Sequence, residues 1–283
     1  MIGHVKADHI ANEVRMKRSS HHGSFLLVEG PTDKRLFRRF TDPTDCQIVV
    51  GYDKSLVFGA VSILDADRFP GALGVVDCDF DMLTGTALRS ANLRRGDTHD
   101  IETLLLRSSA LDSVLCEFGS PDKLVKFIEA KGMTLREWLV RTALPLGYIR
   151  FFSIREGLNL KFEGMTFSHF LDPVTLEINA EALRTEICNR SHRPDLQLDT
   201  ITSVGWPRDV RHDPWQVCCG DDMMEILRFG LRSVLGTNSL TSLQSLDGAL
   251  RVAYPEEEFR QSELYRATRD WERRNPEFRV FRG

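Results

Sequence analysis

The sequence predicts an α/β fold: a small parallel sheet with helices on both faces, a largely helical insertion and a C-terminal helical region. Two apolar runs, 24–28 (SFLLV) and 72–76 (ALGVV), have the length of buried parallel strands and are bounded by turn residues. Stretches with helical spacing of apolar residues lie between the runs. An alternation of strand and helix is typical of parallel sheets, because parallel neighbours need long crossover connections.

The first part of the chain, 1–107, carries this alternation. The residues before 24 are polar and predict a short helix or an irregular lead-in. Thr32 or Asp33 can cap the helix after the first strand, and Leu36, Phe37 and Phe40 share one face of it. The predicted elements are, in order, a strand at 24–28, a helix from about 32, a strand at 47–50, a helix at 54–64, strands at 72–76 and 92–94, and a helix from 100.

Two further parts are expected, a mainly helical insertion at 108–212 and a returning strand–helix with a helical C-terminus at 213–283. Ser120-Pro121 is typical of a helix start, and Thr134 with Glu137 forms a capping-box pattern. Short strands are predicted at 160–162, 176–178 and 215–219. Helices are predicted at about 180–190, 222–235 and 255–275.

Composition narrows the class of protein but not its activity. With 283 residues, 42% of them hydrophobic and 28% charged, the chain can bury a sizeable core. No apolar run is long enough for a bilayer-spanning helix, and the N-terminal segment lacks a signal-peptide core. None of the six cysteines forms a Cys-x-x-Cys pair, which favours reduced thiols over a zinc site. We therefore expect a cytoplasmic protein without a membrane partner. The net charge of −4 argues against a general nucleic-acid coat but permits a local basic channel.

Three carboxylates follow the apolar strand at 72–76. Asp77, Asp79 and Asp81 would repel one another unless a hard divalent cation lies among them. Alternate residues of an extended segment point the same way, so Asp77 and Asp79 can face one ion, and Mg²⁺ (or Mn²⁺) needs only two or three carboxylates. The alternative is that Asp79 and Asp81 are turn and capping residues.

Glu29 follows the other apolar strand and precedes Gly30. Right-handed crossovers place the carboxyl ends of parallel strands at one edge of the sheet, so Glu29 and Asp77 can meet. A glutamate there can bind the metal or transfer a proton. The alternative is a helix-dipole or capping role for the next helix.

These residues resemble the TOPRIM domain of topoisomerases, primases and OLD-family nucleases. Val28-Glu29-Gly30 with Asp33, followed 48 residues later (77 − 29 = 48) by Asp77-Cys78-Asp79, fits the family pattern over about the first 110 residues. The longer pattern resembles the stand-alone AriB-like TOPRIM proteins that accompany ABC-type ATPases in the PARIS anti-phage system. It comprises Glu29-Gly30-Pro31-Thr32-Asp33, Asp77 to Asp81, Asp100-Ile101-Glu102 before Leu104-Leu105, and Gly220-Asp221-Asp222, where the family's His before the second Asp is missing.

The resemblance implies a magnesium-dependent endonuclease. It assigns Glu29 to acid–base and metal work, Asp77 and Asp79 to the metal, and Glu102 to a second ion or its surroundings. For the ATPase-associated members it further implies a toxic effector of antiviral defence, restrained by an ABC-type ATPase partner, with transfer RNA among the RNA or DNA substrates. A homodimer is also expected.

Basic residues near the acidic cluster are candidate phosphate contacts. Lys34, Arg38 and Arg94 could line the path of a nucleic acid, although each alone is better explained by a solvated helix face or loop. His99 lies close to Asp100 and Glu102 in sequence and is a candidate for proton transfer.

Two other functions compete with the nuclease. A haloacid-dehalogenase-like phosphatase also places Asp-x-Asp after a strand, but usually after the first strand and with Thr or Val where Asp81 stands. The second competitor is a non-catalytic sensor or scaffold for an ATPase. The chain itself has no G-x-x-x-x-G-K-[ST] motif, so nucleotide dependence would have to come from a partner.

Overall fold

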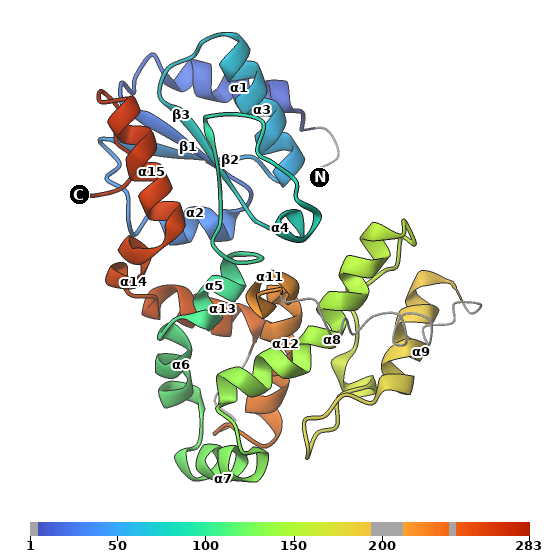
Figure 1. Ribbon diagram of the computed structural model, residues 1–283. Helices are drawn as coiled ribbons and strands as arrows, with labels where there is room; N and C mark the ends of the chain where they lie inside the picture. Colours follow the sequence, from blue (N-terminus) through green and yellow to red (C-terminus); the bar gives the residue numbers. More distant parts are fainter. Residues whose placement is uncertain (1–4, 194–211, 238–241) are drawn as a thin grey trace. The chain divides into compact units, whose positions relative to one another are not determined.

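The computed structural model describes residues 5–193, 212–237 and 242–283 (Figure 1). The chain divides into two compact units. The first comprises Met1–Ile101 and Tyr254–Gly283, and the second is Glu102–Ala253. Residues 213–253 thus belong to the second unit, and the chain returns to the first unit only at Tyr254. None of the described helices is both long and apolar enough to cross a membrane.

The first unit contains a four-stranded, all-parallel sheet, which confirms the predicted α/β class. Its strands are β1 (Ser24–Val28), β2 (Cys46–Val50), β3 (Ala72–Val76) and β4 (Leu93–Arg95), in the order β2-β1-β3-β4. β1 is paired along its whole length with β2. The apolar runs therefore became strands within a residue of their predicted bounds.

The connections explain why helices cover both faces of the sheet. After β1 the chain crosses to β2 on one side through α2 (Pro31–Phe37), and then reverses to β3 on the other side through α3 (Lys54–Ala66). Right-handed crossovers in opposite directions place their helices on opposite faces. The reversal is the topological switch point at which parallel sheets bind ligands.

On the α3 face, α1 (Ala7–Lys17) packs beside α3 (Figure 1). Alternate residues of β1 point to this face, and Phe25 and Leu27 join its cluster. The cluster is fully apolar, and its other members are Ile10, Ala11, Val14, Val49, Val57, Ala60, Val61, Leu64, Ala72, Val76 and Leu93.

The C-terminal segment completes the first unit. The predicted helix at 255–275 is in fact two helices, α14 (Glu256–Gln261) and α15 (Glu263–Arg274). They are separated by Ser262, whose hydroxyl accepts a hydrogen bond from the Tyr265 N–H and so starts a new helix. Trp271 of α15 donates to the side-chain oxygen of Asn92 at 2.7 Å, which fixes the helix against β4. The phenyl ring of Phe259 in α14 stacks on that of Phe40, with ring centroids 4.1 Å apart.

The second unit is helical. Its longest helix, α8 (Leu135–Arg155), packs against α11 (Pro214–Val217) and α12 (Gly220–Ser233), and α6 (Ala110–Phe118) packs against α13 (Leu243–Ala253). The capping box of Thr134 and Glu137 is present at the start of α8. The remaining described elements are α5 (Ile101–Arg107), α7 (Pro121–Lys131), the 3₁₀ turn Phe167–His169 and α9 (Ala180–Ser191).

The strands predicted for this part of the chain are wrong. Residues 214–217 form helix α11, because Asp213 caps the Trp215 N–H and Pro214 occupies the first helical position. Leu160 and Phe162 are buried in a loop rather than in a strand. At 176–178 only the isolated bridge between Leu171 and Ile178 is present. Short apolar triplets indicate burial, and burial alone does not distinguish a strand from a packed loop.

Candidate metal centre

Three strand ends carry charged residues at one edge of the sheet in the first unit. Glu29 follows β1, Asp77 follows β3, and Lys54 begins α3 shortly after β2. β1 and β3 are neighbours in the sheet and parallel, so their carboxyl ends lie side by side. The charged residues thus lie at the switch point of the fold, where a crevice for ligands is expected.

Glu29 and Asp77 are in direct contact. The Glu29 Oε1 accepts a hydrogen bond from the backbone N–H of Asp77 at 2.8 Å. Burial raises the pKa of Glu29 to about 7, the Asp77 hydrogen bond opposes that shift, and the negative charges of Asp79 and Asp33 add to it. Glu29 is therefore a carboxyl group that can both accept and release a proton near neutral pH.

Asp79 lies in a tight turn rather than in an extended segment. Its φ of +47° is left-handed, a conformation that aspartate tolerates better than most residues. Its N–H donates to the carbonyl of His99 at 2.6 Å, which anchors the turn. The expectation that Asp77 and Asp79 share one face of an extended segment is thus wrong, although both remain at the same strand end. The Asp79 side chain is half exposed and accepts a hydrogen bond from Lys54 Nζ at 2.7 Å.

Asp81 is the first residue of the short helix α4 (Asp81–Thr84) and is held by two cations. Its Oδ2 lies 2.9 Å from Lys54 Nζ and 3.0 Å from an Arg95 Nη atom. These contacts are ion pairs without the alignment of good hydrogen bonds. They tie the loop after β3 to the end of β4, which gives Asp81 an anchoring role in this structure.

Lys54 is the member of the cluster that sequence reasoning missed. It is about one-fifth exposed and bridges Asp79 and Asp81. The two carboxylates favour its charged form and raise its pKa, although burial acts in the opposite direction. Its position in the sequence could have revealed it. Lys54 begins the helix after β2, and the carboxyl ends of parallel strands lie at one edge of the sheet, so a position near Glu29 and Asp77 could have been expected.

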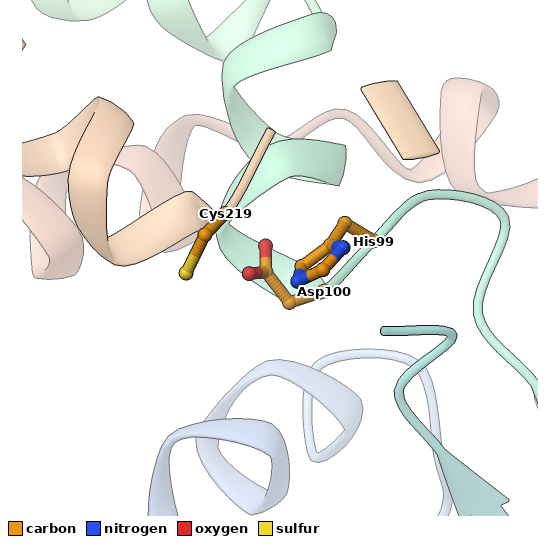
Figure 2. Close-up of side chains that lie close together, drawn as sticks. All are labelled: His99, Asp100 and Cys219. Atoms are coloured by element: carbon orange, nitrogen blue, oxygen red, sulfur yellow. The ribbon is translucent and has the colours of Figure 1, made fainter. Parts of the chain in front are cut away.

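Glu102 lies in the first turn of α5, at the beginning of the second unit. Its proposed role near a second ion stays a prediction. Figure 2 shows the side chains of His99 and Asp100 on the segment that leads into α5. The His99 ring is buried, and its edge-to-face contact with Phe80, with ring centroids 4.6 Å apart, supports the loop that carries Asp79. Cys219, labelled in the same view, precedes α12 in the second unit.

The three predicted phosphate contacts lie apart from the acidic residues. Lys34 and Arg38 line a cavity along the outer edge of β2 together with Lys17 and Arg282. Arg94 points toward α15, where its Nε donates to the carbonyl of Ala267 at 2.9 Å. Burial lowers the pKa of Arg94, in keeping with a packed, structural guanidinium.

Two motif residues have structural roles. Asp33 accepts a hydrogen bond from the Gly30 N–H at 2.8 Å and so closes a capping arrangement at the start of α2. Asp222 forms a bidentate pair with Arg150, with both N–O distances 2.7 Å. The Gly220-Asp221-Asp222 pattern therefore includes a buried ion pair between α8 and α12.

The residues present suit a hard divalent ion. All of the candidate ligands are carboxylate oxygens, which Mg²⁺ and Mn²⁺ prefer. The charge of Asp79 is close enough to add to the effect of burial in raising the pKa of Glu29, while Lys54 acts in the opposite direction. The carboxylate of Asp79 is half exposed.

No protein-family model and no curated protein matches this chain.

Proposed function

We propose that the chain is a metal-dependent phosphodiesterase that cleaves nucleic acid, RNA (including transfer RNA) or DNA, in the manner of TOPRIM nucleases. The observation that carries this proposal is the contact between Glu29 and Asp77 across neighbouring parallel strands. It supports the proposal because it brings a carboxyl group with a pKa of about 7 to the strand end that bears Asp77 and Asp79.

Glu29, Asp77 and Asp79 would hold a magnesium or manganese ion. When bound, such an ion lowers the pKa of water and neutralises charge on a phosphate. Glu29 would also supply the proton-transfer group, because its pKa is about 7 without a bound metal and a carboxyl of that kind can take a proton from water and return one to the leaving oxygen. Lys54 limits the repulsion between the carboxylates, and the pairing of Asp81 with Lys54 and Arg95 keeps the loop in place.

Purified chain incubated with labelled RNA and DNA in Mg²⁺ or Mn²⁺ tests the activity. We expect cleavage by the wild type and loss of at least about 100-fold in rate for Glu29→Gln, as is usual for a group that transfers a proton. Asp53→Asn is a matched control. Asp53 follows β2 and caps α3, and asparagine caps equally well. Full cleavage by Glu29→Gln would refute the assignment, and turnover of small phosphomonoesters instead of nucleic acid would favour the phosphatase.

The same resemblance leads us to propose an ABC-type ATPase as the partner that restrains the nuclease until phage infection. Expression of the wild type alone should then slow cell growth, whereas Glu29→Gln should not. Equal growth inhibition by both chains would contradict a toxic activity centred on Glu29. Binding of the ATPase without any cleavage would favour the sensor or scaffold role.

A further inference from the structure

A cavity of about 440 Å³ lies along the outer edge of β2 in the first unit, and its charged lining residues are all basic. They come from three separate parts of the chain: Lys17 at the end of α1, Lys34 in α2 with Arg38 at its C-cap, and Arg282 near the C-terminus. The remaining lining residues are Thr41, Pro43, Cys46, Gln47 and Ile48.

Two of these cations are unpaired within the described part of the chain. Lys34 and Arg38 are four residues apart on one helix face, and neither has an ion pair or a hydrogen-bonded side chain with a described residue. Like charges at this spacing repel each other. Their position on a shared cavity wall is therefore unfavourable unless an anion binds between them.

The other two cations are held in position. Arg282 donates through Nε to the carbonyl of Thr41 at 3.1 Å, and its charge also acts on the Asp42 carboxylate. Its two terminal nitrogens have no hydrogen bond to a described residue. Lys17 lies 2.6 Å from Glu13, an exposed pair on α1. The nearby Asp42 is occupied by the N–H and hydroxyl of Thr44. Neither acid lines the cavity.

The edge strand adds a backbone donor. The N–H of Ser24 donates to the carbonyl of Asp45, and the N–H of Gly51 donates to the carbonyl of Val28. These two bonds show that the odd-numbered residues of β2 and its flanks direct their backbone groups toward β1. Backbone groups of a parallel strand alternate in direction, so Ile48 turns its N–H to the outer edge of the sheet, where the residue lines the cavity. Guanidinium, ammonium and amide donors converging on one space are the groups that bind phosphate.

The cavity is separate from the acidic edge. It is lined by the first three residues of β2, whereas Glu29 and Asp77 follow the last residues of β1 and β3, and β1 lies between β2 and β3. We propose that this β2-edge cavity is a second site of the first unit, which binds a phosphate group of a phosphate-bearing ligand, either a nucleic-acid backbone or a free nucleotide.

The test compares Lys34→Gln/Arg38→Gln with a matched double variant, Arg35→Gln/Lys126→Gln. The control also removes two exposed positive charges, neither of which lines the cavity. Binding is measured in EDTA, so the result does not depend on a metal or on cleavage. One arm titrates a fluorescent 12-nucleotide single-stranded RNA over a range of salt concentrations, and the other titrates adenosine 5′-monophosphate by calorimetry.

If the ligand is a nucleic-acid backbone, the cavity variant should bind RNA at least about tenfold more weakly. Its slope of log affinity against log salt should fall by about 1.4, because two phosphate contacts are lost, while the control keeps the wild-type values. If the ligand is a free nucleotide, only the monophosphate arm should weaken. Equal binding by the cavity variant and the control in both arms, or no binding by the wild type in either, would overturn the proposal. Circular dichroism of both variants confirms that they are folded.

Discussion

The carboxylate of Glu29 accepts a hydrogen bond from the backbone N–H of Asp77, a residue 48 positions later in the sequence. The contact exists because β1 and β3 are adjacent parallel strands, so that the residues following them leave the sheet side by side. It joins the residue best suited to proton transfer to the loop that carries the aspartates. Burial and the charges of Asp79 and Asp33 raise the pKa of Glu29 to about 7, whereas this hydrogen bond favours the ionised carboxylate.

The first prediction concerns Glu29 and the pH dependence of stability. Its pKa is about 7 in the fold and ordinarily about 4.5, so between these pH values the native state holds a proton that the unfolded chain has released. The stability that this group contributes is complete below pH 4.5 and is lost as the pH rises through 7. Glu29→Gln, which stays neutral, should therefore be more stable than the wild type by about 1–3 kcal/mol at pH 8.

Thermal unfolding at several pH values without metal checks this result. The difference between Glu29→Gln and the wild type should disappear near pH 4.5, where both side chains are neutral. A variant that is equally stable or less stable at pH 8 would show that Glu29 is ionised without penalty in the fold.

The second prediction concerns Lys54, which bridges Asp79 and Asp81. Lys54→Met should destabilise the metal-free protein, because it leaves these carboxylates without their cation. Saturating Mn²⁺ should then stabilise the variant more than the wild type, by a few degrees in midpoint or about 1 kcal/mol. Lys131→Met, which breaks an exposed pair with Glu177, is the control and should not change the response to Mn²⁺. A smaller Mn²⁺ effect in Lys54→Met would mean that the lysine helps rather than replaces the ion.

The third prediction concerns the buried ion pair between Asp222 and Arg150 in the second unit. Asp222→Asn leaves the guanidinium without its charged partner and should cost about 3–5 kcal/mol of unfolding free energy. Asp112→Asn, which breaks the exposed pair with Arg136, should cost less than about 1 kcal/mol. Chemical denaturation of both variants measures the difference. Similar small losses would show that the pair adds little to the packing of α8 against α12.

The centre of the sheet could be predicted from the sequence because every residue of β1 and β3 is buried. SFLLV and ALGVV are apolar apart from Ser24 at the first position, and the observed strands match the predicted bounds. The same property made Glu29 and Asp77 conspicuous, since each is the first charged residue after such a run. Their proximity followed from the handedness of the crossovers rather than from any local signal.

Other parts of the site depend on contacts that a sequence does not display. The left-handed turn at Asp79 is fixed by a hydrogen bond to the His99 carbonyl, 20 positions away (99 − 79 = 20). The sequence favours Arg94 as a phosphate contact, but in the structure its guanidinium binds a backbone carbonyl of α15. The strand predicted at 215–219 did not form, because Asp213 and Pro214 favour a helix start over an extended segment.

Titration of Mn²⁺ into the purified chain by calorimetry tests the central claim most directly, that Glu29, Asp77 and Asp79 bind a divalent ion. We predict that Asp77→Asn weakens Mn²⁺ binding by at least about tenfold, because even the outer-shell partners of a metal contribute that much. Asp53→Asn, which removes the same charge after β2, should bind as the wild type does. Undiminished Mn²⁺ binding by Asp77→Asn, or none by the wild type, would contradict a metal centre at this edge of the sheet.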